Sequence, residues 1–138
     1  MEYKDQVKDF LKRSNDNLEI IKINRGYEFT GLFTNFISAL ILIKENRYIT
    51  KEPISDNNLT CKTVYNTYDI DFEKNTWEFI KHLRNACCHY RINIESKDGE
   101  IDRVRFEDVN SDNKSEKCEI ELNVTEIEKV YKFLFSYL

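Results

Sequence analysis

The sequence predicts a mainly α fold, a four-helix bundle with a small β-hairpin inserted before the last helix. Two observations carry this prediction. The 138 residues include only three glycines and one proline, too few for the many tight turns of a β-sandwich or barrel. Apolar residues recur at helical spacing in four stretches, and they change to strict alternation only between residues 103 and 124. We expect one domain over residues 1–138, a length at which a hydrophobic core is stable without disulfides or bound metal.

The first two predicted helices occupy the first third of the chain. Val7, Leu11 and Leu18 mark an apolar face, which the polar run at 14–17 interrupts. Because that run contains poor helix formers, two alternatives stay open, one bent helix or two helices that meet at a cap. Residues 27–46 carry apolar side chains well beyond one face, so this second helix is expected to be the most buried.

A third helix is expected after a segment that the sequence defines poorly. Residues 47–71 hold the only proline and a polar cluster. A structureless loop of that length would be unusual in a compact domain, so a short helix near Leu59–Tyr65 is expected. Asp71 is the predicted N-cap of the third helix over 72–90. The expected core face of this helix is Phe72, Ile80, Leu83, Cys87 and Tyr90.

The predicted hairpin consists of RVRFEDV (103–109) and KCEIELNV (117–124), two alternating segments joined by a polar loop. Thr125 and Glu128 match a capping box that would begin the last helix. The net charge of −4 gives no indication of nucleic-acid binding, but it does not exclude such binding, because a local basic patch is the feature that matters. No signal sequence is visible, and the longest apolar run is too short to span a bilayer. A cytoplasmic protein without membrane contact is therefore expected.

The segment HLRNACCHYR (82–91) holds both histidines, two of the four cysteines and two arginines. On a helical wheel, Glu78, His82, Asn85 and His89 fall within about 60° of one another, opposite the core face. Glu78 and His82 are four apart and can pair, and Asn85 can orient His89 in the same way. The plain alternative is a solvated helix end, where the helix dipole favours a histidine.

Metal and thiol chemistry fit this segment poorly. Structural zinc sites usually take paired ligands from two knuckles, whereas Cys87 is expected to face the core and His89 the opposite side. Cys61 and Cys118 lie in unrelated segments. Cys88 and His89 diverge by about 100° on a helix, so they do not pair as nucleophile and base. We expect no metal, no cofactor, and cysteines that pack as small apolar side chains.

Arg84 and His89 fit the cleavage of RNA. An arginine fork binds phosphate and a histidine moves a proton at neutral pH. Together they can support attack of a ribose 2′-hydroxyl on the adjacent phosphorus without metal. The two residues lie about 140° apart on an ideal helix, so a two-fold homodimer is expected to line one cleft with both. Lys81, Arg91 and Arg103 are expected to bind RNA around His89.

The string LRNACCHY resembles the signature of the HEPN superfamily, an arginine, a polar residue directly after it, and a histidine after four to six intervening residues. Arg84, Asn85 and His89 fill these places. The resemblance implies a metal-independent endoribonuclease, active as a homodimer and often a toxin or antiviral defence effector. It gives Arg84, Asn85 and His89 the catalytic roles, with supporting places for His82, Glu78 and Tyr90. It also implies a nucleotidyltransferase-type antitoxin as a partner.

The chain departs from one pattern within that superfamily. A subset carries a tyrosine two residues beyond the histidine, which the partner modifies. Here Tyr90 follows His89 directly and Arg91 takes the other position, so core packing is the expected role of Tyr90. A competing function is a non-catalytic HEPN-like binding or regulatory module. Arg84 and His89 favour the enzyme, and the acidic net charge favours the module.

Overall fold

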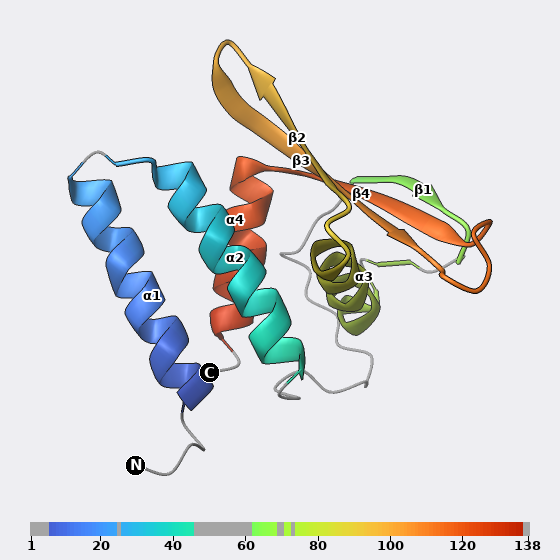
Figure 1. The fold of residues 1–138 in the computed structure, drawn as a ribbon, viewed down its shortest axis with the longest axis horizontal. Coiled ribbons are helices and arrows are strands. Elements are labelled where there is room, and N and C mark those ends of the chain that lie inside the picture. The colour runs from blue at the N-terminus through green and yellow to red at the C-terminus, as the bar shows by residue number, and fades with distance from the viewer. Residues whose placement is uncertain (1–5, 25, 46–61, 69–70, 73, 137–138) are drawn as a thin grey trace.

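Four helices and four strands make up the computed structural model, which describes residues 6–24, 26–45, 62–68, 71–72 and 74–136 (Figure 1). The prediction of a mainly α chain is confirmed. The helices are α1 (Gln6–Ile23), α2 (Glu28–Glu45), α3 (Thr76–Cys88) and α4 (Val124–Phe135). The strands are β1 (Lys62–Asn66), β2 (Ile92–Lys97), β3 (Glu100–Val109) and β4 (Lys117–Asn123). Figure 1 shows α1, α2 and α4 lying alongside one another, with α3 beneath the sheet and seen nearly along its axis.

Helix α1 is one continuous helix, which resolves the two alternatives that the sequence left open. Its polar run makes hydrogen bonds to the neighbouring helices. The side-chain amide of Asn35 on α2 donates to the carbonyl oxygen of Ser14 over 2.9 Å. The hydroxyl of Tyr131 on α4 donates to the side-chain oxygen of Asn15 over 3.1 Å. Residues with weak helix propensity therefore stay helical here because tertiary contacts use their polar atoms.

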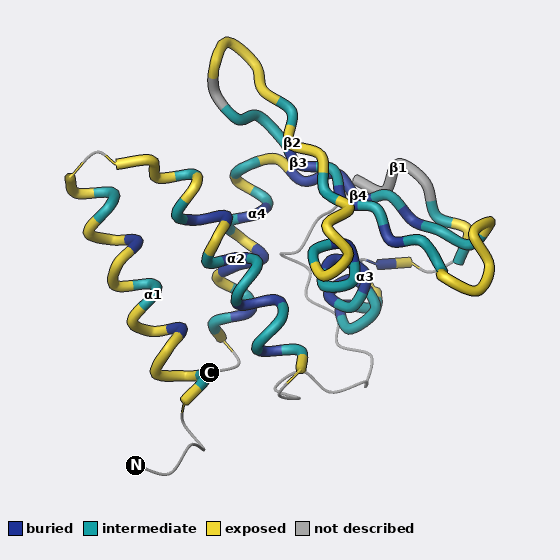
Figure 2. Tube along the Cα trace, viewed as in Figure 1, coloured by how far each residue is buried: buried dark blue, intermediate teal, exposed yellow. Residues whose placement is uncertain are grey.

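Helix α2 is the centre of the helical layer, but the expectation that it is the most buried helix is wrong, since six of its 18 residues are buried against six of the 13 in α3. It packs against α1, α3 and α4, and Figure 2 shows buried segments along most of its length. Its buried residues are Leu32, Phe33, Phe36, Ala39, Leu40 and Ile43. Within the described part of the chain, no helix combines the length and apolarity that a membrane span requires.

The strands form one antiparallel sheet in the order β1-β4-β3-β2. The predicted pair of β3 and β4 is present, but the prediction of a hairpin alone is wrong, because β2 joins β3 and β1 joins β4. The short helix expected near Leu59–Tyr65 is also wrong over 62–65, which belong to β1. Residues 59–61 lie outside the described part. The β-branched Thr63 and Val64 suit a strand paired with β4.

One face of β3 packs on the helices. Val104, Phe106 and Asp108 alternate along the strand and are buried, as a period of two requires. The ring of Phe106 lies 5.9 Å from that of Phe36 and 6.4 Å from that of Phe33, both on α2. Asp108 is the third residue of this inward row, and β3 also packs on α3. A carboxylate thus enters the boundary between the sheet and α3.

Two predicted helix caps are wrong. Asn75, not Asp71, caps α3, and its side chain accepts from the backbone N–H of Glu78. The capping box of α4 is formed by Asn123 and Glu126, two residues before the predicted pair. In both cases a neighbouring residue with an equivalent side-chain oxygen takes the cap, because several residues nearby satisfy the same short pattern.

Candidate active site at the end of helix α3

Helix α3 ends in a tight reversal at the predicted histidine. His89 is the C-cap residue, with φ −93° and ψ 7°. The backbone N–H of Arg91 donates to the carbonyl of Ala86 over 2.8 Å, and that of Tyr90 to the carbonyl of Cys87 over 3.2 Å. These two bonds define a Schellman motif. The reversal brings the side chains of His89 and Arg91 to the same cavity.

Tyr90 occupies the left-handed position of this motif, with φ 53°. Glycine is usual at that position, and for a residue with a side chain the left-handed conformation costs about 1–2 kcal/mol of conformational energy. Tyr90 is 84% exposed, so the expectation that it packs in the core is wrong. The physical reason is that α3 stops at Cys88, and Tyr90 therefore does not continue the helical stripe from which that expectation came.

A cavity of about 360 Å³ lies beside the last turns of α3. It brings together five residues that the sequence singles out and five that it does not. The predicted ones are Lys81, His82, Asn85, His89 and Arg91. The others are Tyr68, Asp108, Val109, Asn110 and Ser111. The cavity walls thus combine two histidines, an amide and two cations among the predicted residues with an aromatic ring and polar groups from the sheet side.

His82 is buried rather than presented on an open stripe. It is 2% exposed, and its ring lies 4.8 Å from that of Tyr68 and 5.4 Å from that of Phe72. Its Nδ1 lies 2.6 Å from Asp108 Oδ2, and its Nε2 lies 3.5 Å from Glu78 Oε2. The expected pairing of Glu78 with His82 is therefore present, and two carboxylates flank the imidazole. Its burial leaves His82 little access to a substrate.

Asp108 connects the sheet to α3 through one oxygen atom. Asp108 Oδ2 accepts from Asn85 Nδ2 over 3.0 Å and also contacts His82 Nδ1. Burial alone would raise the pKa of Asp108, but the hydrogen bonds with His82 and Asn85 outweigh it and lower that pKa below its ordinary value. Asp108 is therefore a carboxylate at neutral pH. A carboxylate only accepts, so His82 Nδ1 carries the proton in this contact.

Asn85 and His89 share a backbone hydrogen bond, from the N–H of His89 to the carbonyl of Asn85 over 3.0 Å. The side-chain nitrogen of Asn85 is directed to Asp108 instead. Asn85 and His89 both line the cavity. His89 itself is exposed at the cavity rim, so its imidazole is accessible to a substrate where that of His82 is not.

Arg84 points to a different side of α3. Its guanidinium lies 3.3 Å from the carboxylate of Glu45 at the end of α2, and it is absent from the residues that line the cavity. This agrees with the angle between Arg84 and His89 that an ideal helix gives. Within one chain, the described structure therefore does not bring Arg84 and His89 to a common point.

The three cations that the sequence predicts to bind RNA do not form one patch. Lys81 and Arg91 line the cavity with His89. Arg103 lies on β3, where its guanidinium is 2.9 Å from both Asp102 and Glu121. Those two carboxylates pair with Arg103, so Lys81 and Arg91 are the predicted RNA-binding cations that share the cavity with His89.

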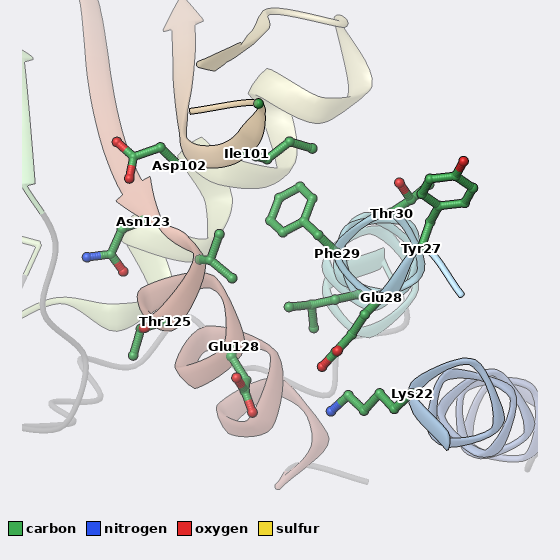
Figure 3. A pocket seen from close by; sticks show the side chains of 13 residues that line it. Lys22, Tyr27, Glu28, Phe29, Thr30, Ile101, Asp102, Asn123, Thr125 and Glu128 are labelled. Atoms are coloured by element: carbon green, nitrogen blue, oxygen red, sulfur yellow. The ribbon is translucent and has the colours of Figure 1, made fainter. Parts of the chain in front are cut away.

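A larger cavity of about 800 Å³ lies at the other end of the molecule, between the starts of α2 and α4 and the β2–β3 turn. Figure 3 shows Lys22 facing Glu28 and Glu128 across its opening. Asp102 adds a third carboxylate to the lining. Because carboxylates outnumber cations here, this cavity is a poor candidate for RNA, and none of the predicted site residues lines it.

The three cysteines in the described part of the chain are free thiols, each in a distinct environment. Burial raises the pKa of Cys87 and of Cys118 to about 12, so both stay protonated near neutral pH. Cys88 is exposed. In the described ranges, no three His, Cys, Asp or Glu side chains are grouped closely enough to hold a metal ion. Cys61 lies outside those ranges.

A sequence model of the family described as HEPN pEK499 p136 matches residues 1–138. No curated protein and no solved structure matches the chain significantly.

Proposed function

The chain belongs to the HEPN pEK499 p136 family, and from that membership we propose that it is a metal-independent endoribonuclease. We further propose that it acts as a toxin or antiviral defence effector in the cytoplasm. Ribonuclease activity is common among HEPN domains. The observation that carries the proposal is the cavity at the end of α3, where an exposed histidine adjoins two cations and an amide.

The groups at the cavity match the steps of 2′-hydroxyl attack. His89 accepts the proton of the ribose 2′-hydroxyl, and the 2′-oxygen forms a bond to the adjacent phosphorus. The bond from phosphorus to the 5′-oxygen breaks, that oxygen takes up a proton from water, and His89 returns the proton that it accepted to solvent. The products are a 2′,3′-cyclic phosphate and a 5′-hydroxyl. Lys81 and Arg91 stabilise the negative charge that builds up on the phosphate oxygens.

Arg84 enters this chemistry through a homodimer. In one chain it faces Glu45, whereas His89 faces the cavity. A two-fold axis near α3 would place Arg84 beside the cavity that contains His89 of the partner subunit. The planar guanidinium would then hold the scissile phosphate through two hydrogen bonds. Asn85, fixed by Asp108, would present its amide oxygen to His89 or to the ribose.

The test is RNA cleavage by the purified protein in EDTA, with analysis of the product ends. Wild type should leave cyclic phosphates, and His89→Ala should lower the rate by about 10²–10⁴ without changing the melting temperature. Arg84→Lys should also cleave poorly because an ammonium cannot form the fork. His82→Ala should lower the melting temperature, since it empties a buried position. Cleavage lost in a folded His82→Ala variant but kept in His89→Ala would show the motif to be misassigned.

A second candidate is a non-catalytic regulatory module that associates with a nucleotidyltransferase-type partner. The observation that favours it is the occupation of Arg84 and Arg103 by carboxylates of the same chain, which reduces the charge available to RNA. Equal cleavage rates for wild type and for His89→Ala in the assay above would favour this module over the enzyme.

A further inference from the structure

Two lysines lie over the ring of Trp77, on the side of α3 that faces the end of α2, and Arg84 lies close enough to one of them to affect its charge. Lys44 Nζ lies 5.1 Å from the centre of the Trp77 ring, and Lys81 Nζ lies 5.3 Å from it. Arg84 follows Lys81 by about one turn of α3, and its ion pair with Glu45 places it next to Lys44. We name Lys44, Trp77, Lys81 and Arg84 the Trp77 cluster.

The Trp77 cluster concentrates positive charge. Partial burial lowers the pKa of Lys44 from its ordinary value, and the charges of Arg84 and Lys81 lower it further, while the carboxylates of Glu45 and Glu78 offset part of this effect. Nearby carboxylates bond to the other two cations, Glu45 to Arg84 over 3.3 Å and Glu78 to Lys81 over 3.5 Å. Among the residues that the structure describes, no ion pair involves Lys44. The aromatic ring holds two ammonium groups together, and a further anion would relieve their repulsion.

Lys81 connects this cluster to the candidate active site. It belongs to the cluster through Trp77, and it also lines the cavity that contains His89. Along α3, Lys81 and His89 are separated by an axial distance of about 12 Å, at roughly 1.5 Å per residue. A chain of phosphates that reaches the cavity could therefore continue onto the Trp77 cluster.

We propose that the Trp77 cluster binds the phosphodiester backbone of a single RNA strand as it enters the cavity, an inference that rests on the proposed function. Lys44 and Lys81 supply point charges for the phosphates of this strand, and Arg84, whose planar fork holds the scissile phosphate in the proposed homodimer, lies at the end of the same row. Glu45 occupies Arg84 in the free protein. The side chain of Glu45 is 54% exposed and that of Arg84 is 24% exposed, so the pair is open to solvent on its carboxylate side, where a phosphate can displace Glu45.

The proposal is tested by binding of a fluorescent 2′-O-methyl RNA strand, which lacks the nucleophile and stays intact with wild-type protein. Anisotropy titrations at several salt concentrations give Kd and its salt dependence. Lys44→Gln should weaken binding by about 3- to 10-fold and reduce the slope of log K against log salt by about 0.7. Lys44→Arg should bind like wild type. Glu45→Gln should bind more tightly than wild type, because it removes the competing anion from Arg84.

An exposed ion pair on α4 provides matched controls. Glu128 and Lys132 lie 3.1 Å apart, with side chains that are 40% and 74% exposed, so Lys132→Gln and Glu128→Gln repeat the same changes in net charge away from α3. Both should bind RNA like wild type. Lys44→Gln should melt at or above the wild-type temperature, since it removes repulsion from Arg84 and Lys81.

The outcomes separate this proposal from the proposed enzyme. Weaker binding by Lys44→Gln together with no cleavage of unmodified RNA would support the cluster and refute the nuclease. Cleavage by wild type with equal Kd and salt slope for Lys44→Gln and Lys132→Gln would overturn the cluster. Equal increases in RNA affinity for Glu45→Gln and Glu128→Gln would also overturn the proposed role of the cluster, because the change in overall charge would then explain the tighter binding. An absence of measurable RNA binding by wild type would also overturn it.

Discussion

Replacing Asp108 with alanine should destabilise the folded chain by about 2–4 kcal/mol, although the change lies outside the sequence motif. Asp108 Oδ2 is shared by His82 Nδ1 and Asn85 Nδ2. In Asp108→Ala both donors lose a charged acceptor. His82 is 2% exposed, so water has poor access to its Nδ1, and an unsatisfied buried donor costs about 1–3 kcal/mol.

Asn85 should contribute the smaller part of this loss. It lines the cavity, where water can replace the carboxylate, so its contribution is about 1 kcal/mol. For a chain of 138 residues, each kcal/mol shifts the melting temperature by roughly 3–4 °C. The expected fall for Asp108→Ala is therefore about 6–16 °C.

Urea unfolding and thermal melting of wild type and Asp108→Ala measure this effect, with Asp9→Ala as the control. Asp9 forms an exposed pair with Arg13 at 3.0 Å on α1, and such a pair contributes about 0.3–0.5 kcal/mol. A free-energy loss for Asp108→Ala as small as that for Asp9→Ala would refute the reasoning, because it would mean that the two donors find other partners.

A charge exchange sharpens the test. Asn85→Asp alone would place two carboxylates about one hydrogen bond apart and should destabilise the chain. Adding Asp108→Asn restores a donor opposite an acceptor, so the double variant should recover part of the stability lost in Asn85→Asp. Additive losses from the two substitutions would contradict the contact between Asn85 and Asp108.

Three further predictions concern the same region. Tyr90→Gly should raise the unfolding free energy by about 0.5–1 kcal/mol, because it relieves the left-handed strain at an exposed position; a loss of stability in urea unfolding would contradict this. Maleimide labelling at neutral pH, followed by peptide mass analysis, should modify Cys88 well before Cys87 and Cys118, whose pKa values burial raises to about 12; equal rates would contradict the burial. The lowered pKa of Asp108 means that its contribution is present above about pH 3.9, the unfolded value, and is lost as pH falls through the folded value. The stability difference between wild type and Asp108→Asn should therefore shrink on acidification below about pH 4, and a difference independent of pH would show that Asp108 is not ionised in the fold.

Patterns that depend on one element alone were predictable from the sequence. The periodicity of 27–46 predicts the central helix α2, and the alternation in 103–109 and 117–124 predicts β3 and β4. The caps were less predictable because short polar patterns overlap. Thr125 with Glu128 and Asn123 with Glu126 have the same spacing, and only the course of the preceding strand selects the second pair.

The candidate site depends on contacts between distant segments, which a helical wheel does not contain. The wheel places His82 on a polar stripe, but Tyr68 and Asp108 cover it. One signal was available in the sequence. The alternation of Val104 and Phe106 continues inward to Asp108, and a charged residue on the buried face of a strand marks a polar partner opposite. The separation of Arg84 from His89, in contrast, followed directly from the helical angle.

The shared oxygen of Asp108 also constrains how relatives of this chain can diverge. His82 and Asn85 stand one turn apart on α3, and both depend on a single carboxylate from β3. A substitution at any one of the three positions leaves a polar group at another without its partner. Relatives should therefore differ at two or all three of these positions together, with each substitution compensating for the other. In an alignment of homologues, positions 82, 85 and 108 should therefore covary, more strongly than either helix position covaries with exposed neighbours such as Cys88.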